Sequence, residues 1–442
     1  MNGPFFGASG RGVLAARLSA ALLLLASISA VSACTGTSAA STGTLPSATS
    51  SSSATPAVSP TAPTNQLPEG DWTTLHWSQI TTPIAPLPTN NESDSWEFKI
   101  FGWSGGYVGF RETWHMTADG DLTSASIVPS VSADGMHWRD GQALSLPDPD
   151  TQVVRVVEGP AGLLAVGWIS QLPTCGGPPF ATALWLSTDG GADWTPVSVA
   201  TAFGSDRAMS IKAGSAGYIA TGTGSGGAVN WISTDGIQWT RHPLSAFTNA
   251  SVQSEAAFAG GFVMAGTIIG EPGCGDTTIK SVVWWSTSGL SWRQATLGTF
   301  KAATDGGMLV TRITDRELIA IHTDWGTNGG ADTAKAWVSA DGKQWTSYPL
   351  SADAQTHQIL TNGTRGIALP NSLRGDGGAV NTVLVFQPDM SLEPMKQLGA
   401  LPLGDQDDPV YLNEGQVAFG PAGILVVDGS GSRFWLGVPA AQ

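Results

Sequence analysis

The chain has 442 residues and a formal net charge of −15, and 12% of its residues are charged whereas 41% are apolar. A surface this acidic argues against nucleic-acid and anionic-lipid partners, because binding to phosphate groups needs clustered lysine and arginine side chains. The 56 glycines and many short apolar runs are typical of an all-β fold built from hairpins. We therefore expect an all-β protein with no nucleic-acid partner.

Residues 1–33 have the character of a secretion signal. Arg11 and Arg17 precede an apolar run at residues 18–28, which is too short to span a bilayer comfortably. The run leads into Val-Ser-Ala-Cys34, which resembles the lipobox of bacterial lipoproteins. The resemblance implies that Cys34 is diacylated and becomes the new N-terminus, which anchors an extracytoplasmic protein to the cell membrane. The alternative is an ordinary signal peptide with a chance cysteine.

Residues 34–69 are almost entirely serine, threonine, alanine and proline. Such a segment has too few apolar side chains to bury a core, so the composition predicts a disordered tether. The folded domain is expected to comprise residues 70–442.

One short turn sequence recurs at intervals of about fifty residues, and a period of that length indicates an array of similar structural units. In each copy an aspartate can accept bonds from backbone N–H groups, a glycine can adopt a positive φ, and a tryptophan can cover the turn. The copies are residues 132–138, 187–194, 233–239, 286–292 and 339–345.

These copies resemble the Asp-box, or BNR, repeat of sialidase-like β-propellers. Residues 187–194 match its full spacing of Ser, Asp, Gly and Trp, and the other copies have one residue fewer between Gly and Trp. The resemblance assigns a structural role to the turn aspartates, whereas Ser288 occupies that position in the fourth copy. The aspartates are Asp134, Asp189, Asp235 and Asp341.

An apolar strand, a glycine-rich turn and a second apolar strand precede each copy, so each repeat contains four strands, as a propeller blade does. We predict a single β-propeller of seven four-stranded blades, with six or eight as alternatives. The last blade lacks an outer strand after Trp435, and residues 75–80 resemble the strands that follow the turns. The N-terminal strand is therefore expected to pair beside Trp435 and to close the ring.

The resemblance places the loops between the second and third strands on the ligand face of the propeller. Tryptophans there would form a stacking platform for a sugar or a peptide, although solvated loop positions are the alternative reading of any one residue. The candidates for this face are Trp114, Trp168, Trp325, Arg374 and Tyr411.

Cys175 and Cys274 lie in two of these loops, and an extracytoplasmic location favours a disulfide between them over metal ligation. Residues 405–408 are acidic and could suit calcium, but their spacing is not that of an EF-hand, and a solvated loop is the preferred interpretation. We expect no metal and no other cofactor.

The sequence offers an incomplete set of residues for hydrolysis. A sialidase needs an arginine triad, a Tyr–Glu nucleophile pair and an acid–base aspartate, and Tyr411 is the one tyrosine expected to reach the ligand face. The first-strand arginines Arg155, Arg207 and Arg312 could line the channel or pair with acids. Residues 102–106 match G-x-S-x-G, but they are expected in a tight turn between strands and not at a nucleophile elbow.

The sequence therefore predicts a monomeric, membrane-anchored extracytoplasmic lipoprotein whose propeller binds a glycan or a protein partner without catalysis. Two alternatives from other classes are a sialidase-like glycoside hydrolase and an assembly factor similar to the photosystem II stability factors.

Overall fold

A computed structural model describes most of the region that the sequence assigns to the folded domain. The residues that the structure describes all belong to one compact unit of the chain. They are residues 70–80, 95–117, 122–170, 180–214, 217–224, 227–243, 247, 250–258, 260–269, 278–301, 306–313, 317–324, 333–349, 357–361, 366–370, 372–373, 384–386, 392–394, 396–399, 410–411, 415–428 and 431–441.

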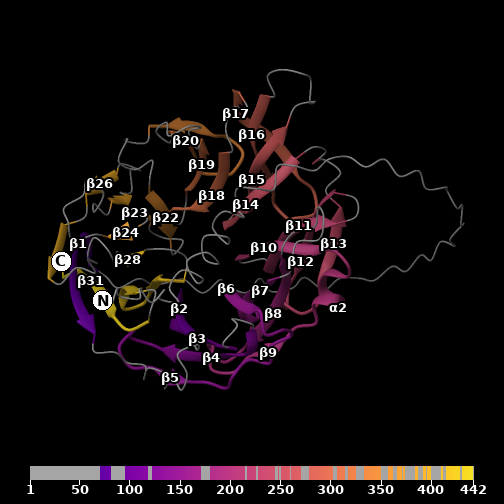
Figure 1. Ribbon diagram of the computed structural model, residues 1–442. Helices are drawn as coiled ribbons and strands as arrows, with labels where there is room; N and C mark the ends of the chain where they lie inside the picture. Colours follow the sequence, from indigo (N-terminus) through magenta and orange to yellow (C-terminus); the bar gives the residue numbers. More distant parts are fainter. Residues whose placement is uncertain are drawn as a thin grey trace, which may run out of the picture. The chain divides into compact units, whose positions relative to one another are not determined.

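This unit is an all-β propeller of antiparallel blades (Figure 1). Within each four-stranded blade the strands follow one another in chain order, joined by hairpins. The first three blades are β2 (Ser95–Trp103), β3 (Gly106–Met116), β4 (Leu122–Ser132) and β5 (Arg139–Asp140); β6 (Thr151–Gly159), β7 (Gly162–Ser170), β8 (Phe180–Ser187) and β9 (Thr195–Pro196); and β10 (Arg207–Gly214), β11 (Gly217–Gly224), β12 (Gly227–Ser233) and β13 (Thr240–Pro243).

Three further blades have the same plan. They are β14 (Ala250–Phe258), β15 (Gly261–Ile269), β16 (Thr278–Ser286) and β17 (Arg293–Lys301); β18 (Gly306–Arg312), β19 (Leu318–Asp324), β20 (Thr333–Ser339) and β21 (Thr346–Tyr348); and β22 (His357–Thr361), β23 (Gly366–Pro370), β25 (Leu384–Phe386) and β26 (Leu392–Pro394). The first strands of consecutive blades contact one another from β2 through β22.

The prediction of seven four-stranded blades is wrong, because the described residues form six. The remaining large sheet has five strands in the order β27–β1–β31–β30–β29. Its strands are β1 (Asp71–Ile80), β27 (Lys396–Gly399), β29 (Val417–Gly420), β30 (Gly423–Val427) and β31 (Phe434–Ala440). The extra strand arises because the segment after β26 runs parallel along β1. A two-stranded sheet pairs β24 (Ser372–Leu373) with β28 (Val410–Tyr411).

In the five-stranded sheet, β1 lies beside β31 (Figure 1) and is antiparallel to it. Gln79 lies opposite Trp435. The two strands come from opposite ends of the described chain. Asp71 lies opposite Ala440, so the first residue of β1 is at the end of the sheet where β31 finishes.

The turns between third and fourth strands, together with those between first and second strands, mark one end of each blade, which we call the turn face. The opposite end, where second strands lead to third strands, we call the loop face. Five of the described first turns end in a glycine with positive φ, such as Gly106 (φ 152°) and Gly162 (φ 126°). A Cβ at Gly106 would lie 2.3 Å from the carbonyl oxygen of Ser132, so only glycine allows this approach.

Apolar side chains pack between neighbouring blades, and the third-strand tryptophans are among the largest of them. Trp185, Trp231 and Trp284 are almost completely buried. Between the second and third blades, Ser198 caps the short helix α2 (Val199–Phe203) and Phe203 packs against Trp231 with ring centroids 4.9 Å apart. Burial of large aromatic side chains is the main favourable contribution to the packing of one blade on the next.

Candidate functional site

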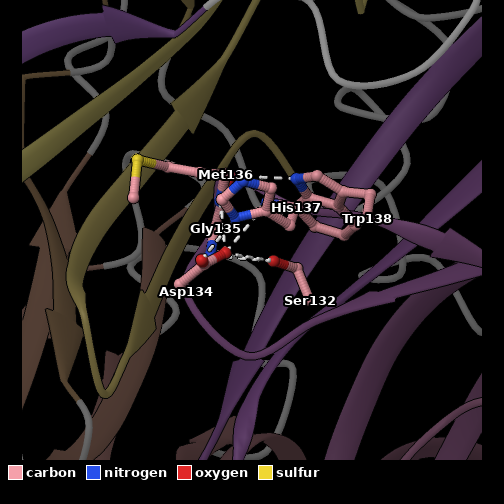
Figure 2. A network of polar contacts seen from close by, with 6 residues as sticks. All are labelled: Ser132, Asp134, Gly135, Met136, His137 and Trp138. Atoms are coloured by element: carbon pink, nitrogen blue, oxygen red, sulfur yellow. Dashed lines mark hydrogen bonds and ion pairs between the residues drawn. The ribbon is translucent and has the colours of Figure 1, made fainter.

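The repeated turns form a network of local hydrogen bonds, which Figure 2 shows for residues 132–138. The Oδ1 atom of Asp134 accepts from the backbone N–H groups of Met136 and His137, both at 2.9 Å. The Oγ of Ser132 accepts from Gly135 N at 2.8 Å, and Trp138 Nε1 donates to the carbonyl of Gly135 at 2.9 Å. Each conspicuous residue of the motif thus satisfies a backbone group of its own turn.

The aspartate contacts recur in the copies that keep the aspartate. Asp235 accepts from the N–H groups two and three residues later at 2.9 and 2.8 Å, and Asp341 does so at 2.8 and 2.9 Å. In the longer second copy, Asp189 accepts from residues 192 and 193. Partial burial would raise the pKa of Asp134, but bonds from His137 and Met136 hold that pKa well below its usual range. The turn carboxylates are therefore ionised and occupied at neutral pH.

A buried cluster of charges lies on the first two strands of the first blade. Glu112 is completely buried, and one of its oxygens lies 3.0 Å from Lys99 Nζ. The other oxygen accepts from Val153 N at 2.7 Å, which joins the first blade to β6 of the second. Glu97 lies opposite Glu112 across the strands and 3.5 Å from Lys99 Nζ.

The environment of this cluster changes the proton affinity of both partners. Burial raises the pKa of Glu112 to about 7, although Lys99 opposes the change. Burial would lower the pKa of Lys99, but the carboxylates of Glu112 and Glu97 raise it above its ordinary value. Two carboxyl groups around one ammonium group can hold a proton near neutral pH. Both carboxyl groups here are already paired with Lys99, so neither is presented to a substrate.

A second polar chain crosses three neighbouring blades. Arg155 on β6 donates to Ser210 Oγ on β10 at 2.9 Å, and Ser210 Oγ in turn donates to Glu255 on β14. The other oxygen of Glu255 accepts from Thr221 on β11 at 3.2 Å. Glu255 is 1% exposed. The first-strand arginine Arg155 is thus bonded within the wall of the propeller.

Two tyrosines serve packing between blades. Tyr218 Oη donates to the carbonyl of Gly162 in the preceding blade at 2.9 Å, and burial raises its pKa to about 12. Tyr107 Oη donates to the carbonyl of Gly423 at 2.9 Å, and burial raises its pKa as well. These phenols are poor nucleophiles, because they are protonated at neutral pH and are already bonded to backbone oxygens.

The G-x-S-x-G match is also part of a structural contact. Ser104 lies in the turn between β2 and β3, as the sequence predicts. Its backbone N–H donates to Glu158 Oε2 at 2.9 Å, and its hydroxyl donates to the other oxygen of Glu158. The carboxylate of Glu158 on β6 fixes this turn against the second blade.

Of the residues predicted for the ligand face, Trp114 and Trp168 are described. Trp114 is on β3 opposite Ser95, and Trp168 is on β7 opposite Gln152, both towards the loop-face ends of their strands and both partly exposed. Strand alternation puts Trp114 on the same face of β3 as Glu112, which contacts the second blade. Both tryptophans belong to neighbouring blades, whose first strands β2 and β6 are in contact.

The other predicted residues are less well defined. The backbone of Tyr411 pairs with Ser372, two residues before Arg374, in the sheet formed by β24 and β28. The predicted residues that lie outside the described part of the chain are Trp325, Arg374, Cys34, Cys175 and Cys274.

The inter-blade carboxylates are the main feature that the sequence analysis missed. The sequence could have indicated the cluster of Glu97, Lys99 and Glu112. Two acids and a base lie on two consecutive predicted strands that are rich in apolar residues, which is typical of a buried ion pair. Glu255 gives a weaker signal, since its partners Ser210 and Thr221 come from another blade. Within the described residues, no group of three His, Cys, Asp or Glu side chains is arranged to hold a metal ion. No helix among the described residues has the length and apolar character required to cross a membrane.

Comparison with known proteins gives fold likeness alone. No protein-family model matches the chain, and no curated protein sequence does. Solved structures with a similar fold include a protein of unknown function from Dyadobacter fermentans, which is 14% identical, has a TM-score of 0.32 and is matched over 72% of this chain and 96% of its own.

Two similar structures are enzymes. A glycosyl hydrolase from Bacteroides ovatus is 13% identical with a TM-score of 0.30, matched over 65% of this chain and 94% of its own. The Trypanosoma rangeli sialidase is 14% identical with a TM-score of 0.33, matched over 72% of this chain and 58% of its own. Likenesses at this level carry no argument about activity.

Proposed function

We propose that this chain is an extracytoplasmic, lipid-anchored binding protein whose propeller holds a glycan or a protein partner at the loop face without turning it over. The observation that carries the proposal is that the buried carboxylates of Glu112 and Glu255 are bonded to other groups of the propeller. Glu112 is bonded to Lys99 and the second blade, and Glu255 is bonded to Ser210 and Thr221. A catalytic carboxylate must instead reach the substrate or a water molecule.

The geometry of the described tyrosines and arginines supports the same proposal. Tyr107 and Tyr218 donate to backbone oxygens of a neighbouring sheet. Arg155, one of three arginines that a sialidase-like site would recruit, is bonded to Ser210. A sialidase-like hydrolysis would therefore need Tyr411 as its nucleophile, as the sequence predicts, and could not use Tyr107 or Tyr218.

Trp114 and Trp168 are the described part of the proposed binding surface. Aromatic faces stack on sugar rings and on extended peptide, each contact contributing about 1 kcal/mol. Trp325 and Arg374 are proposed to extend this surface, since their loops belong to the same face in a propeller. The partner is recognised mainly by apolar stacking, with few charged contacts.

We also propose that the five-stranded sheet closes the ring between the sixth and first blades, and that the five turns are Asp boxes. Tyr107 reaches Gly423 of this sheet just as Tyr218 reaches Gly162 of the second blade. The glycines at the end of the preceding strands, Gly420 and Gly159, lie against the same two tyrosine rings. The five-stranded sheet thus contacts the first blade as one blade contacts the next.

The anchor and the disulfide are proposals from the sequence. Diacylation of Cys34 would hold the domain outside the cell membrane on the tether of residues 34–69. A bridge between Cys175 and Cys274 would join loops of the second and fourth blades, and it would contribute on the order of 4 kcal/mol by limiting the unfolded chain.

The decisive experiment measures turnover and binding on the same preparation of the intact protein. We expect no release of aryl alcohol from aryl sialosides or other aryl glycosides, together with a change in tryptophan fluorescence when soluble cell-wall glycan or a membrane-protein partner is added. Hydrolysis that disappears in Tyr411→Phe would overturn the proposal in favour of a glycoside hydrolase.

A further inference from the structure

Exposed apolar side chains recur at one position of the repeated turns. Met136, Ile237 and Leu290 each directly follow the turn glycine, and they are 46%, 45% and 58% exposed. In the fifth copy the same position is held by Lys343, which is also exposed. Three bulky apolar groups at equivalent places on separate blades form a pattern, whereas isolated exposed apolar residues are common on any surface.

The five-stranded sheet adds a fourth apolar side chain at the same end of the propeller. A Cβ at Gly423 would meet the carbonyl of Gly437, just as a Cβ at Gly217 would meet that of Ser233, so Gly437 occupies the place of a turn serine. The next residue, Val438, is 38% exposed. Four of the five large exposed apolar residues in the described chain therefore lie at the turn face, and the fifth, Leu309, is on β18.

The turns hold these side chains in fixed positions. The backbone N–H groups of Met136 and Ile237 are each bonded to a turn aspartate at 2.9 Å. Leu290 N donates to Ser288 Oγ at 3.3 Å. Because the backbone of each turn is already ordered, little backbone entropy would be lost when these apolar side chains bind to another surface. The entropic cost of association is therefore lower.

The first described strand begins at this same face. β1 starts at Asp71, which is paired with Ala440 at the turn-face end of β31. Figure 1 shows the two strands side by side. Residues 34–69 directly precede this point in the sequence. A lipid on Cys34 would therefore be joined to the turn face, and not to the face that carries Trp114 and Trp168.

Charges near the tips are mixed. Arg139, Arg293 and Lys343 are exposed beside the turns. The first and fifth of these turns also carry Asp134 and Asp341, whereas the fourth has Ser288 in the place of the aspartate. The turn face therefore offers no strong attraction for an anionic surface, and its distinctive property is the set of apolar tips. Apolar side chains of this kind favour the interface between lipid headgroups and acyl chains.

We propose that the turn face docks on the surface of a lipid bilayer, with Met136, Ile237 and Leu290 inserted among the headgroups. The inference rests on the proposed lipid anchor. Three side chains that insert only shallowly bind a bilayer weakly, and the anchor would keep the propeller at a high local concentration beside it. In this orientation the loop face is directed away from the membrane, where it meets a glycan or a protein partner.

Amide hydrogen exchange of the full, lipidated chain tests the orientation. In phosphatidylcholine vesicles, as compared with detergent micelles, exchange should slow in residues 134–138, 235–239 and 288–292 and stay unchanged in residues 111–117 near the loop face. The M136S/I237S/L290S variant should lose this protection. The matched T234A/T287A variant, changed at exposed positions in the same turns, should keep it. Equal exchange in vesicles and micelles for the unmodified turns would overturn the proposal.

A second measurement separates docking from anchoring. A chain with Cys34→Ala that also lacks residues 1–33 carries neither a lipid nor the apolar run at residues 18–28, so its sedimentation with phosphatidylcholine vesicles reports the turn face alone. We expect weak binding that resists added salt and that falls by about tenfold or more in the M136S/I237S/L290S background. If mass spectrometry finds no lipid on Cys34 in the parent chain, the anchor fails while this comparison still decides docking. Equal vesicle binding of the two Cys34→Ala chains, or no binding by either, would refute docking even where the anchor is present.

Discussion

The hydroxyl of Tyr107 donates to the carbonyl of Gly423 at 2.9 Å, joining residues that are 316 positions apart in the chain. Tyr218 makes the same bond to Gly162 between two blades that are adjacent in sequence. Around Tyr107 lies a cluster of buried apolar residues from β2, β3 and β29 to β31, including Phe98 and Phe434. One phenol thus marks the contact between the two ends of the described fold.

Removing this hydroxyl should weaken the contact. Tyr107→Phe leaves the buried Gly423 carbonyl without its donor, so we expect a loss of about 1–2 kcal/mol in the free energy of unfolding. Urea denaturation measures it, and Tyr218→Phe is the matched comparison at a contact within the blade series. A loss in Tyr218→Phe with none in Tyr107→Phe would show that the five-stranded sheet does not pack as a blade does.

Deleting β1 tests ring closure directly. A chain lacking residues 35–69 should melt like the parent, whereas a chain lacking residues 35–82 should melt well below it and aggregate. The reason is that β31 then loses its antiparallel partner and presents an unpaired edge. Unchanged melting and solubility in the longer deletion would place the closure elsewhere.

Glu112 should make stability depend on pH near neutrality. Its pKa is about 7 in the folded protein and lies near 4.5 when the chain is unfolded. A folded pKa above the unfolded value gives stability that is complete below about pH 4.5 and is lost as pH rises through 7. We expect a contribution on the order of 1–3 kcal/mol, which Glu112→Gln should remove. Denaturation midpoints between pH 5 and 8.5 that fall equally in both proteins would contradict this assignment.

The fourth turn offers a gain-of-stability test. Ser288 bonds only weakly to Leu290 N, at 3.3 Å, where Asp235 accepts two short bonds in the third turn. Ser288→Asp should therefore stabilise the protein by about 1 kcal/mol, and Asp235→Ala should destabilise it by about 1–2 kcal/mol. Thermal or urea unfolding reports both changes, and a destabilising effect of Ser288→Asp would mean that the carboxylate is not needed there.

Trp114 and Trp168 should affect binding and not folding. Each is partly exposed, so replacement by alanine should leave the melting temperature within a few degrees of the parent. The Trp114→Ala/Trp168→Ala double variant should abolish the fluorescence response to the glycan or protein partner. Trp185→Ala is the contrasting control, because this side chain is 1% exposed and its loss should cost about 3–5 kcal/mol. A similarly large loss of stability in the double variant would identify the pair as core residues.

The turns and hairpins of the fold could be predicted from the sequence. The serine, aspartate, glycine and tryptophan of each turn bond to one another within seven or eight residues, so their spacing carries the whole of the turn's geometry. The same is true of the hairpins, since alternating apolar residues and turn glycines specify both strands of a pair. The pairing of residues 75–80 with the strand that contains Trp435 was suggested by their likeness to strands that follow other turns.

The features that only the tertiary structure decided are contacts between blades and between distant strands. The fifth strand, β27, could not be foreseen, because its pairing with β1 is set by the path of the backbone after β26. The partners of Glu112 and Glu255 belong to other blades, and nothing in the local sequence of either glutamate names Val153 or Ser210. Packing of one blade against the next fixed these pairs. The same packing bonds Arg155, which the sequence left as a possible channel residue, to Ser210 of the next blade.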